Sequence, residues 1–349
     1  MSRWIGAMLG VAGLTATAWP AAAQSGAQVT LMTYSGIFQE QYTAGVIEPF
    51  QAASGHRVQY FAPGTSAQML GTLRAQKADP QVDVVIMDTT TAALACAEGL
   101  VEKITPAEMP VLNQIDAQAR TAGGGCGPGV TFDHLVMIYD TKAINPAPTR
   151  FMDMANPALR GRVSVSAPPN IQGLVLTAIL AHANGGDWRN LRNAIPGLKE
   201  IAANAQTFDP KPDGATMILN DQIAFATGWN ARSQLYSLQS QGRIGVVLPQ
   251  EGTAFQINTI NIVAGSRNAA AARAFMAHAL SAEAQKAFTE RLFYGPTNTT
   301  AQISPEARAR TAQSAEFNAR VIPLDWVEMQ RVRENWNQRW RREVITAQQ

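Results

Sequence analysis

The segment Asp83-Val84-Val85-Ile86-Met87-Asp88 decides the fold class of this chain. It is apolar, rich in β-branched residues and too short for a helix, which is typical of a buried strand in a parallel sheet. Upstream of it, apolar runs predict strands at 29–34 and 58–61. Helical spacing predicts one helix between Gly36 and Gly55 and another at 66–77. This β-α-β-α-β order predicts an α/β domain with a largely parallel sheet.

The same alternation continues through the rest of the chain. Further strands are expected at 132–139, 162–166, 223–229, 244–248 and 257–264, and further helices at 174–182, 268–280, 281–291 and 325–344. In the last helix, Trp326, Met329, Trp336 and Trp340 keep helical spacing, which predicts a core-facing stripe rather than a ligand box. A length of 349 residues suggests about two domains. Because no low-complexity linker separates them, we expect two α/β lobes joined by short crossing strands.

Composition and the N-terminus restrict the class of protein. The chain has 28 Lys and Arg residues against 26 Asp and Glu residues. It has no basic run that could bind a phosphate backbone, so no nucleic-acid partner is expected. Arg3 precedes an apolar run over 4–19, and Ala21-Ala22-Ala23 follows it. This pattern predicts a secretory signal peptide over residues 1–23 and a periplasmic mature protein. The apolar run is shorter than the roughly 20 residues that span a bilayer.

The chain has only two cysteines. Cys96 lies in a helix predicted at 91–98, and Cys126 lies in the Gly-rich loop 123–129. In an exported protein such a pair predicts a disulfide that clamps the loop onto the helix. A reactive thiol is the alternative, and it would need a nearby base and a reducing compartment. The loop fits neither the dinucleotide-binding nor the P-loop spacing, so no cofactor is expected.

Several segments, spread over nearly the whole chain, occur in the order of one known family. They are Thr33-Tyr34-Ser35-Gly36, 83–90, 129–140, 157–163, Gly228-Trp229-Asn230, Pro249-Gln250-Glu251-Gly252 and Tyr294-Gly295-Pro296-Thr297-Asn298. With them the chain resembles the periplasmic solute-binding proteins of ABC importers, specifically the spermidine/putrescine-binding-like group. The resemblance implies a type II periplasmic binding protein fold that closes over a small-molecule solute and delivers it to the permease subunits. A monomer is expected.

The resemblance also implies where the lobes lie. The chain would cross between them near Asp133 and again near Asn258. The first lobe would comprise 27–133 plus 258–318, and the second 134–257 plus 319–349. Each lobe would be a mostly parallel sheet flanked by helices, and the C-terminal helix would return to the second lobe.

Candidate ligand-binding residues follow the ends of the predicted strands. In open α/β sheets these ends and the following helix N-termini form the binding crevice. Tyr34, Ser35, Thr89 and Thr90 could exchange hydrogen bonds with a polar solute, and Asp88 could pair with a positive group. Alternatively, the hydroxyls only cap the following helix. Trp229 could stack on an organic ligand or cation, and ordinary core packing is the alternative.

The charge of the solute stays open at this stage. In polyamine binders the strand after the Glu251-Gly252 turn carries a Trp and an Asp that touch the ligand, and here Gln256 and Asn258 take those places. Asp133 could add negative charge at the crossing, whereas Arg232 would favour a carboxylate or phosphonate unless it is a solvated helix-face charge. The sequence favours a polyamine or other amine-bearing solute, with an organic acid or phosphonate as the alternative.

Metal binding and catalysis have weaker support. Ferric-ion relatives of this group need paired tyrosines, and the chain has no adjacent pair. The four histidines are scattered and have no metal-ligand spacing, so no metal is expected. The chain also lacks G-x-S-x-G and H-E-x-x-H, so it is not expected to be an enzyme. An exported enzyme of unknown reaction stays the alternative.

Overall fold

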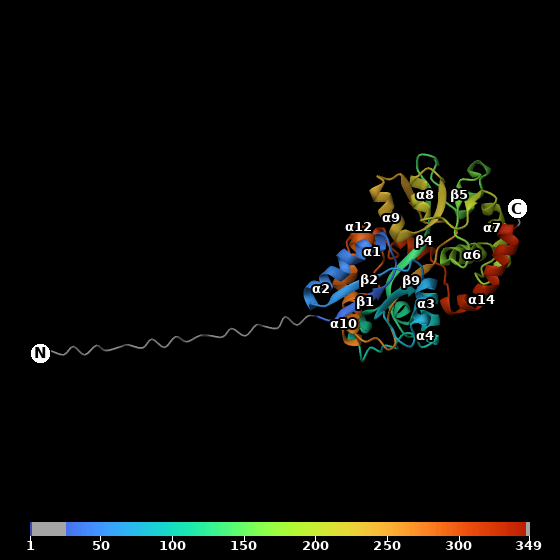
Figure 1. Ribbon diagram of the computed structural model, residues 1–349. Helices are drawn as coiled ribbons and strands as arrows, with labels where there is room; N and C mark the ends of the chain where they lie inside the picture. Colours follow the sequence, from blue (N-terminus) through green and yellow to red (C-terminus); the bar gives the residue numbers. More distant parts are fainter. Residues whose placement is uncertain (2–25, 347–349) are drawn as a thin grey trace.

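The computed structural model describes Met1 and residues 26–346 (Figure 1). Apart from Met1, the predicted signal peptide over 1–23 lies outside the described residues. Within the described ranges, every helix is too short or too polar to cross a bilayer.

The first half of the fold is the predicted β-α-β-α-β unit. Strands β1 (Gln28–Met32), β2 (Arg57–Phe61) and β3 (Val84–Asp88) pair in parallel in the order β2-β1-β3. All five residues of β3 are buried, as its apolar sequence predicted. The connecting helices are α1 (Ile37–Tyr42), a π-helical turn (Thr43–Ile47), α2 (Glu48–Ser54) and α3 (Ser66–Ala75), and α4 (Thr89–Ala97) follows β3. Gly55 ends α2 with a φ of 71°, in the left-handed region that favours glycine.

One long strand joins the two halves of the fold. β4 (Gly129–Asp140) is buried along its whole length and changes its partners halfway. Up to His134 it pairs with β9 (Phe255–Ile262), and from Leu135 it pairs with β7 (Phe225–Trp229), both antiparallel. β9 also pairs antiparallel with β3, so the sheet is mixed at its centre. The order is β2-β1-β3-β9-β4-β7-β5-β6, in which β5 (Val163–Ser164) and β6 (Ala205–Thr207) are parallel, while β8 (Ile244–Val247) pairs with β4.

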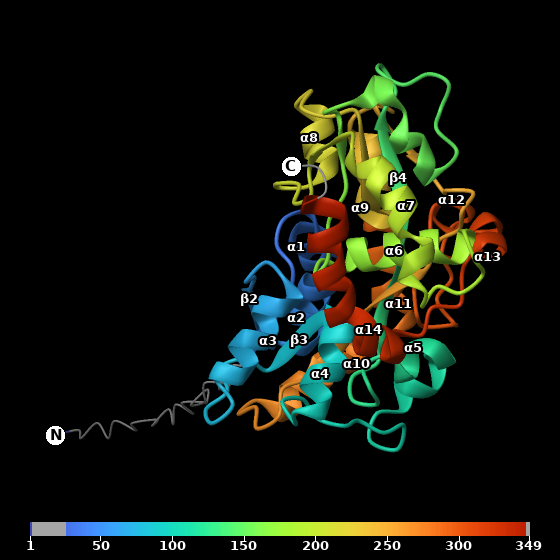
Figure 2. The same ribbon diagram turned by 90° about the vertical axis from the view of Figure 1, so that its right-hand side faces the viewer.

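Helices cover both halves of the sheet (Figures 1 and 2). The remaining α-helices are α5 (Ala117–Thr121), α6 (Ile171–Ala183), α7 (Ile195–Ala202), α8 (Gly214–Leu219), α9 (Asn230–Gln239), α10 (Ala269–Ala279), α11 (Ala282–Leu292), α12 (Pro305–Ala309), α13 (Ala315–Arg320) and α14 (Trp326–Arg339). A π-helical segment (Trp340–Ile345) continues α14, and 3-10 turns lie at Pro110–Gln114, Phe151–Ala155, Pro157–Leu159 and Leu191–Asn193. Ser281 caps α11, because its hydroxyl accepts from the N–H of Ala284.

The hydrophobic side chains gather in two main cores. The first core lies around β1, β3 and β9 and includes Val29, Phe38, Ile86, Ile260 and Phe288. The second core lies around the later part of β4 and includes Leu135, Leu176, Phe225, Trp336 and Trp340. β4 contributes to both, through Phe132 on one side of its partner change and Leu135 on the other.

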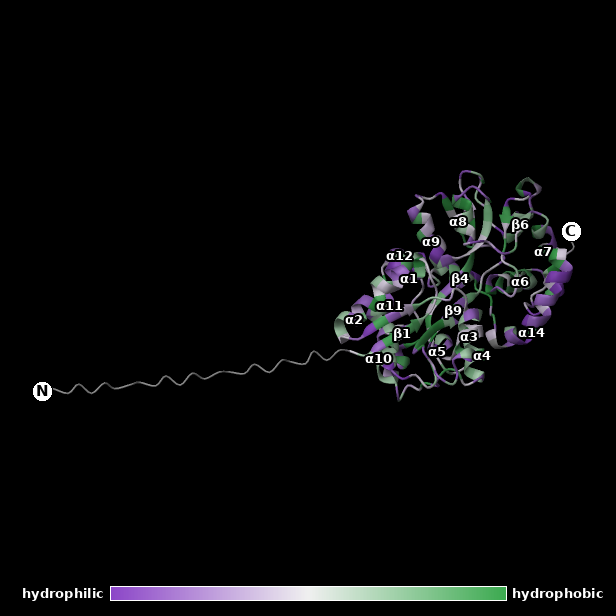
Figure 3. Cartoon of the chain, in the orientation of Figure 1, coloured by the Kyte–Doolittle hydropathy of each residue, from purple (hydrophilic) through white to green (hydrophobic). Residues whose placement is uncertain are grey.

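The C-terminal helix belongs to the second core. Met329, Trp336 and Trp340 are buried there, which confirms the predicted stripe, and Trp326 is half-buried at its edge. The indole N–H of Trp340 donates to the Thr177 hydroxyl of α6 at 2.7 Å. The outer face of α14 is hydrophilic (Figure 3). Figure 2 shows α14 running along the molecule to α4, and the two helices pack against each other. α14 therefore connects the second core to an element of the first half.

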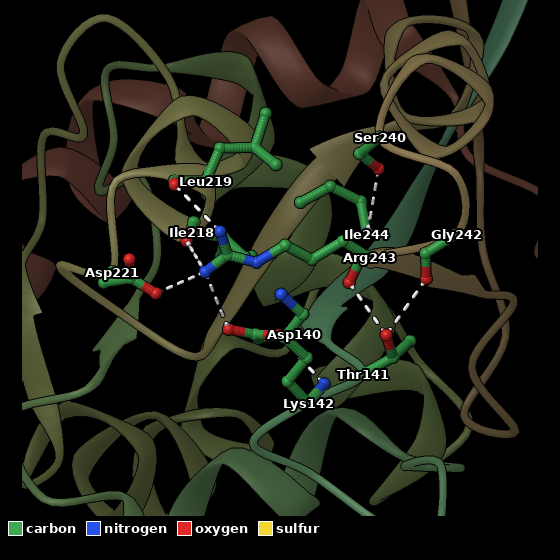
Figure 4. A network of polar contacts seen from close by, with 10 residues as sticks. All are labelled: Asp140, Thr141, Lys142, Ile218, Leu219, Asp221, Ser240, Gly242, Arg243 and Ile244. Carbon is green, nitrogen blue, oxygen red and sulfur yellow. Dashed lines mark hydrogen bonds and ion pairs between the residues drawn. The ribbon is translucent and has the colours of Figure 1, made fainter.

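The far end of β4 is fixed by a polar network (Figure 4). The Arg243 guanidinium donates to the Asp140 carboxylate at 3.2 Å and to the carbonyl oxygens of Ile218 and Leu219 at 3.2 and 3.1 Å. It also pairs with Asp221. These contacts tie the end of β4 to the C-terminus of α8.

Candidate functional site

A row of polar side chains lies on one face of the two crossing strands. β4 and β9 pair Asp133 with Gln256 and Thr131 with Asn258. Directly paired residues point to the same face of a sheet, as do residues two apart, so these four side chains share a face. All four are buried. The Gln256 amide donates to the Asn258 side-chain oxygen at 2.7 Å, and the Asn258 amide donates to the Thr131 hydroxyl at 3.0 Å.

The opposite face of the same strands is apolar. Phe132 and Ile257, which alternate with the polar residues, lie in the first core. The rings of Phe132 and Phe255 are 4.9 Å apart, and the His134 ring lies 4.7 Å from Phe317. A buried polar row backed by a packed apolar face is the arrangement expected of a binding surface rather than of a core.

Tyr34 joins the polar row to the first half of the fold. Its phenol donates to the Asn258 side-chain oxygen at 3.1 Å and shares a 2.9 Å hydrogen bond with the Ser66 hydroxyl. Burial and the nearby Asp88 carboxylate raise the pKa of Tyr34, so the phenol keeps its proton at neutral pH. Ser35, the next residue in the turn, is exposed.

Asp88 caps α4, and the hydroxyls of the threonines after it donate to groups within the protein. The Asp88 carboxylate accepts from the N–H of Thr91 at 2.9 Å and from the hydroxyls of Thr90 and Thr91 at 2.5 and 2.8 Å. The Thr89 hydroxyl donates to the carbonyl of Ala122 at 2.6 Å. These groups therefore have partners within the protein, although Asp88 and not the threonine hydroxyls caps the helix, and their contact with a solute stays a prediction.

The disulfide predicted from the sequence holds this helix in place. Cys96 of α4 is bonded to Cys126, and their Cα atoms are 5.8 Å apart. Cys126 lies three residues before β4, and Ala122, which accepts from Thr89, lies in the same loop. The disulfide thus ties the helix at the candidate site to the start of the crossing strand.

The second half of the fold presents a cation to the polar row. Trp229 ends β7, is half-buried and packs against the second core, and Arg232 lies in the first turn of α9. Burial tends to lower the pKa of Arg232, but Tyr294, Tyr34 and Asp213 outweigh it, so the net shift is upward. The guanidinium is therefore a fixed charge beside two phenols. Its Nε is buried without a hydrogen-bond partner.

Asp133 lies beside the start of α9. Its Oδ1 accepts from the N–H groups of His134 and Ala231 at 2.9 and 3.1 Å, whereas its Oδ2 is buried and has no partner. Burial raises the pKa of Asp133 to about 7, although the two N–H groups and Arg232 oppose the rise. On the apolar face, burial lowers the pKa of His134 to about 3, so that ring is neutral at pH 7.

Sequence reasoning assigned no role to several residues that lie here. Tyr294 follows α11, stacks on Phe288 at 5.4 Å and interacts electrostatically with Arg232. The phenol of Tyr60, on β2, donates to the Tyr34 carbonyl at 2.5 Å. The Tyr294-Gly295-Pro296 segment was a visible signal for Tyr294, but the sequence holds no signal that places Tyr60 near the others.

Two surface grooves of the described residues are not lined by Thr131, Asp133, Gln256 or Asn258. One is lined mainly by Phe255 and residues 321–325, and the other by Tyr60, Phe61 and polar residues of β1 and β2. At the row itself, the side chains of Tyr34, Asn258 and Gln256 bond to one another. In residues 26–346, no three His, Cys, Asp or Glu side chains gather in a way that could hold a metal ion.

Comparison with known proteins agrees with this architecture. The profile of the family described as bacterial extracellular solute-binding protein matches residues 45–315. A γ-aminobutyric acid-binding protein of Pseudomonas aeruginosa is 24% identical over 336 residues, which cover 89% of this chain and 90% of that protein. The spermidine/putrescine-binding periplasmic protein of Escherichia coli K12 is 22% identical, with 79% and 80% covered.

Solved structures of type II periplasmic binding proteins have the same fold. The structure titled Atu4243-GABA receptor superposes with a TM-score of 0.72 at 21% identity and covers 90% of this chain and 96% of that one. The periplasmic binding protein AfuA of Actinobacillus pleuropneumoniae, with fructose-6-phosphate bound, gives 0.75 at 19% identity and covers 91% and 98%. The expected fold class is confirmed.

Proposed function

Because the chain belongs to the bacterial extracellular solute-binding proteins, we propose that it is the periplasmic solute-binding component of an ABC importer. It captures a small polar solute between two lobes and presents it to the permease subunits, without altering it chemically. We assign the lobes to 27–133 plus 258–318 and to 134–257 plus 319–349. The presence of two main cores supports this division, although Ala231 and Ile257 of the second range pack in the first core. The partner change along β4, between His134 and Leu135, supports a hinge there.

Arg232 is the observation that carries the proposal for the solute class. A guanidinium has five N–H donors in a planar fork and pairs best with a carboxylate or phosphate. Here it is half-buried, keeps its charge beside neutral phenols and has an unpartnered Nε. Tyr294 and Asp133 lie near this guanidinium, but its buried Nε has no acceptor, which is costly, and an anionic group of the solute would supply one. We therefore place a carboxylate of the solute at Arg232.

The neighbouring residues suit the rest of a small organic solute. Tyr34, Gln256 and Asn258 offer hydrogen bonds from the first lobe and the hinge, and Trp229 offers an aromatic ring from the second. Closure would bring these groups together around the solute. An amino acid, an organic acid or a related anion fits this arrangement better than a diamine, which has no group for Arg232.

A thermal-shift screen of the purified protein tests this function. The panel contains putrescine, γ-aminobutyrate, butyrate and other small amino acids and organic acids, and mass spectrometry follows each compound for turnover. We expect stabilisation by a carboxylate-bearing compound without any product. Arg232→Gln should weaken binding at least about tenfold, equivalent to about 1.4 kcal/mol. The exposed Arg160→Gln is the matched control.

Two results would contradict the proposal. Formation of a product would show an enzyme. If the Arg232→Gln variant and the wild type bind the stabilising compound with equal affinity, the anionic group of the solute does not bind Arg232.

A further inference from the structure

We propose that Asp133 is the specificity-determining residue of this site and that its free carboxylate oxygen receives the ammonium group of a zwitterionic solute. This inference rests on the proposed function, in which Arg232 holds the carboxylate of the same solute. The solute class is thereby narrowed from carboxylate-bearing compounds in general to small amino acids.

The geometry of Asp133 supports this role. The residue lies on the polar face of β4, next to the point where the strand changes its partner, and is 1% exposed. Oδ1 is occupied by two backbone N–H groups, but Oδ2 is buried and has no donor. A buried carboxylate oxygen without a donor costs free energy that a hydrogen-bond donor from a solute would recover. An ammonium group supplies both the donor and the opposite charge.

The other candidate partners for an ammonium group already accept hydrogen bonds within the protein. The Asp88 carboxylate accepts three hydrogen bonds from Thr90 and Thr91 as the cap of α4. Asn258 accepts from Gln256 and from Tyr34 through its side-chain oxygen. Of the two acidic residues that the sequence suggested for this site, Asp133 is the one with a buried carboxylate oxygen that has no hydrogen-bond partner.

The backbone also couples Asp133 to Arg232. Oδ1 of Asp133 accepts from the N–H of Ala231, the residue immediately before Arg232. The crossing strand thus fixes the first turn of α9, and with it the position from which the guanidinium extends. A solute that carries both an ammonium and a carboxylate group can satisfy Asp133 and Arg232 together. Putrescine lacks the carboxylate and butyrate lacks the ammonium group, so each can satisfy only one.

The affinity should depend on pH with a defined sign. The charged and titratable groups near Asp133 are Arg232 on α9 and Tyr294 after α11, and His134, the next residue on β4, has its ring on the opposite face. Since the pKa of Asp133 lies at about 7, acidification protonates the free protein at this carboxyl. An ammonium group must then displace a proton, and its affinity should fall by up to about tenfold per pH unit below neutrality.

Titration calorimetry with three probes tests the inference. γ-Aminobutyrate, butyrate and putrescine are titrated into the wild type, into Asp133→Asn, and into the exposed Asp209→Asn as a control with the same charge change. We expect γ-aminobutyrate to bind the wild type at least about tenfold more tightly than either other probe. In Asp133→Asn, the affinity for γ-aminobutyrate should fall to that for butyrate, and the affinity for butyrate should stay unchanged. Asp209→Asn should not show this loss.

The pH profile of the wild type provides a readout that needs no variant. Over about pH 5.5 to 8.5 both charges of γ-aminobutyrate are constant, because carboxyl groups titrate near pH 4 and amines near pH 10. Affinity that rises with pH to a plateau above neutrality supports an ionised Asp133 that binds the ammonium group. Affinity that falls as pH rises would mean that a protonated Asp133 donates to the solute, which overturns the inference.

The remaining outcomes separate this inference from the proposed function. Equal binding of butyrate and γ-aminobutyrate overturns the role of Asp133 and leaves Arg232 as the anion site. Tight binding of putrescine alone overturns both assignments. If none of the probes binds while another organic acid stabilises the protein in the screen, the zwitterion inference fails and the transport function stands.

Discussion

Arg232 shows which properties of a residue can be predicted from the sequence and which depend on the fold. In the sequence it could be a solvated charge on a helix face, because spacing alone does not show what lies opposite. The fold brings Tyr34 and Tyr294 beside it from segments far away in the chain. Asp133 could be proposed from its place at the crossing, but its free Oδ2 depends on which backbone N–H groups reach Oδ1. Residue type and position were therefore predictable, whereas hydrogen-bond occupancy was not.

Trp229 gives a prediction at this scale. Its ring is half-buried at the end of β7, directly before the helix that carries Arg232. If it stacks on the solute, Trp229→Ala should weaken binding of γ-aminobutyrate at least about tenfold in calorimetry, or about 1.4 kcal/mol. The unfolding midpoint of the variant should be measured alongside, since the ring also packs against the second core. An unchanged affinity would mean that Trp229 does not contact the solute.

At the scale of elements, hydrophobic patterns predicted most of the fold. The strands before residue 90, the helix with Phe38, Tyr42 and Phe50 buried on one face, and the stripe of α14 are all present. The pairing of β9 with both β3 and β4 could not be read from periodicity, because register depends on contacts between segments more than 100 residues apart. That register places Asp133, Gln256, Thr131 and Asn258 on one face, so the candidate site could be predicted only as a list of residues.

The disulfide gives a prediction for one element. Cys96–Cys126 closes a loop with a sequence separation of 30. Replacing both residues by Ser should lower the free energy of unfolding by about 3 kcal/mol, because the unfolded chain gains freedom. Urea denaturation measures this loss, and treatment of the wild type with a reductant should reproduce it. An equal denaturation midpoint in all three samples would mean that packing alone holds the loop against α4.

At the scale of the molecule, the candidate site draws residues from both cores. Tyr34 and Asn258 belong to the side of the first core and Trp229 to the side of the second, while Arg232 lies on α9, whose Ala231 packs in the first core. A solute held by both sides stabilises both against unfolding, because binding to the native state adds its free energy to the whole linked structure. Stabilisation of both cores by the solute is therefore expected if two lobes close around it. A binding site on one lobe would stabilise only that lobe.

Differential scanning calorimetry measures this stabilisation. With γ-aminobutyrate at about a hundredfold over its Kd, every unfolding transition should move to higher temperature, with a total stabilisation of about 2.7 kcal/mol. Arg232→Gln, whose affinity is expected to be at least about tenfold lower, should be stabilised by at most about 1.4 kcal/mol under the same conditions. If the wild type unfolds in two transitions and the ligand moves only one, the solute contacts a single lobe. The proposed hinge at β4 would then play no part in solute capture, because closure of the lobes would add no contact to the solute.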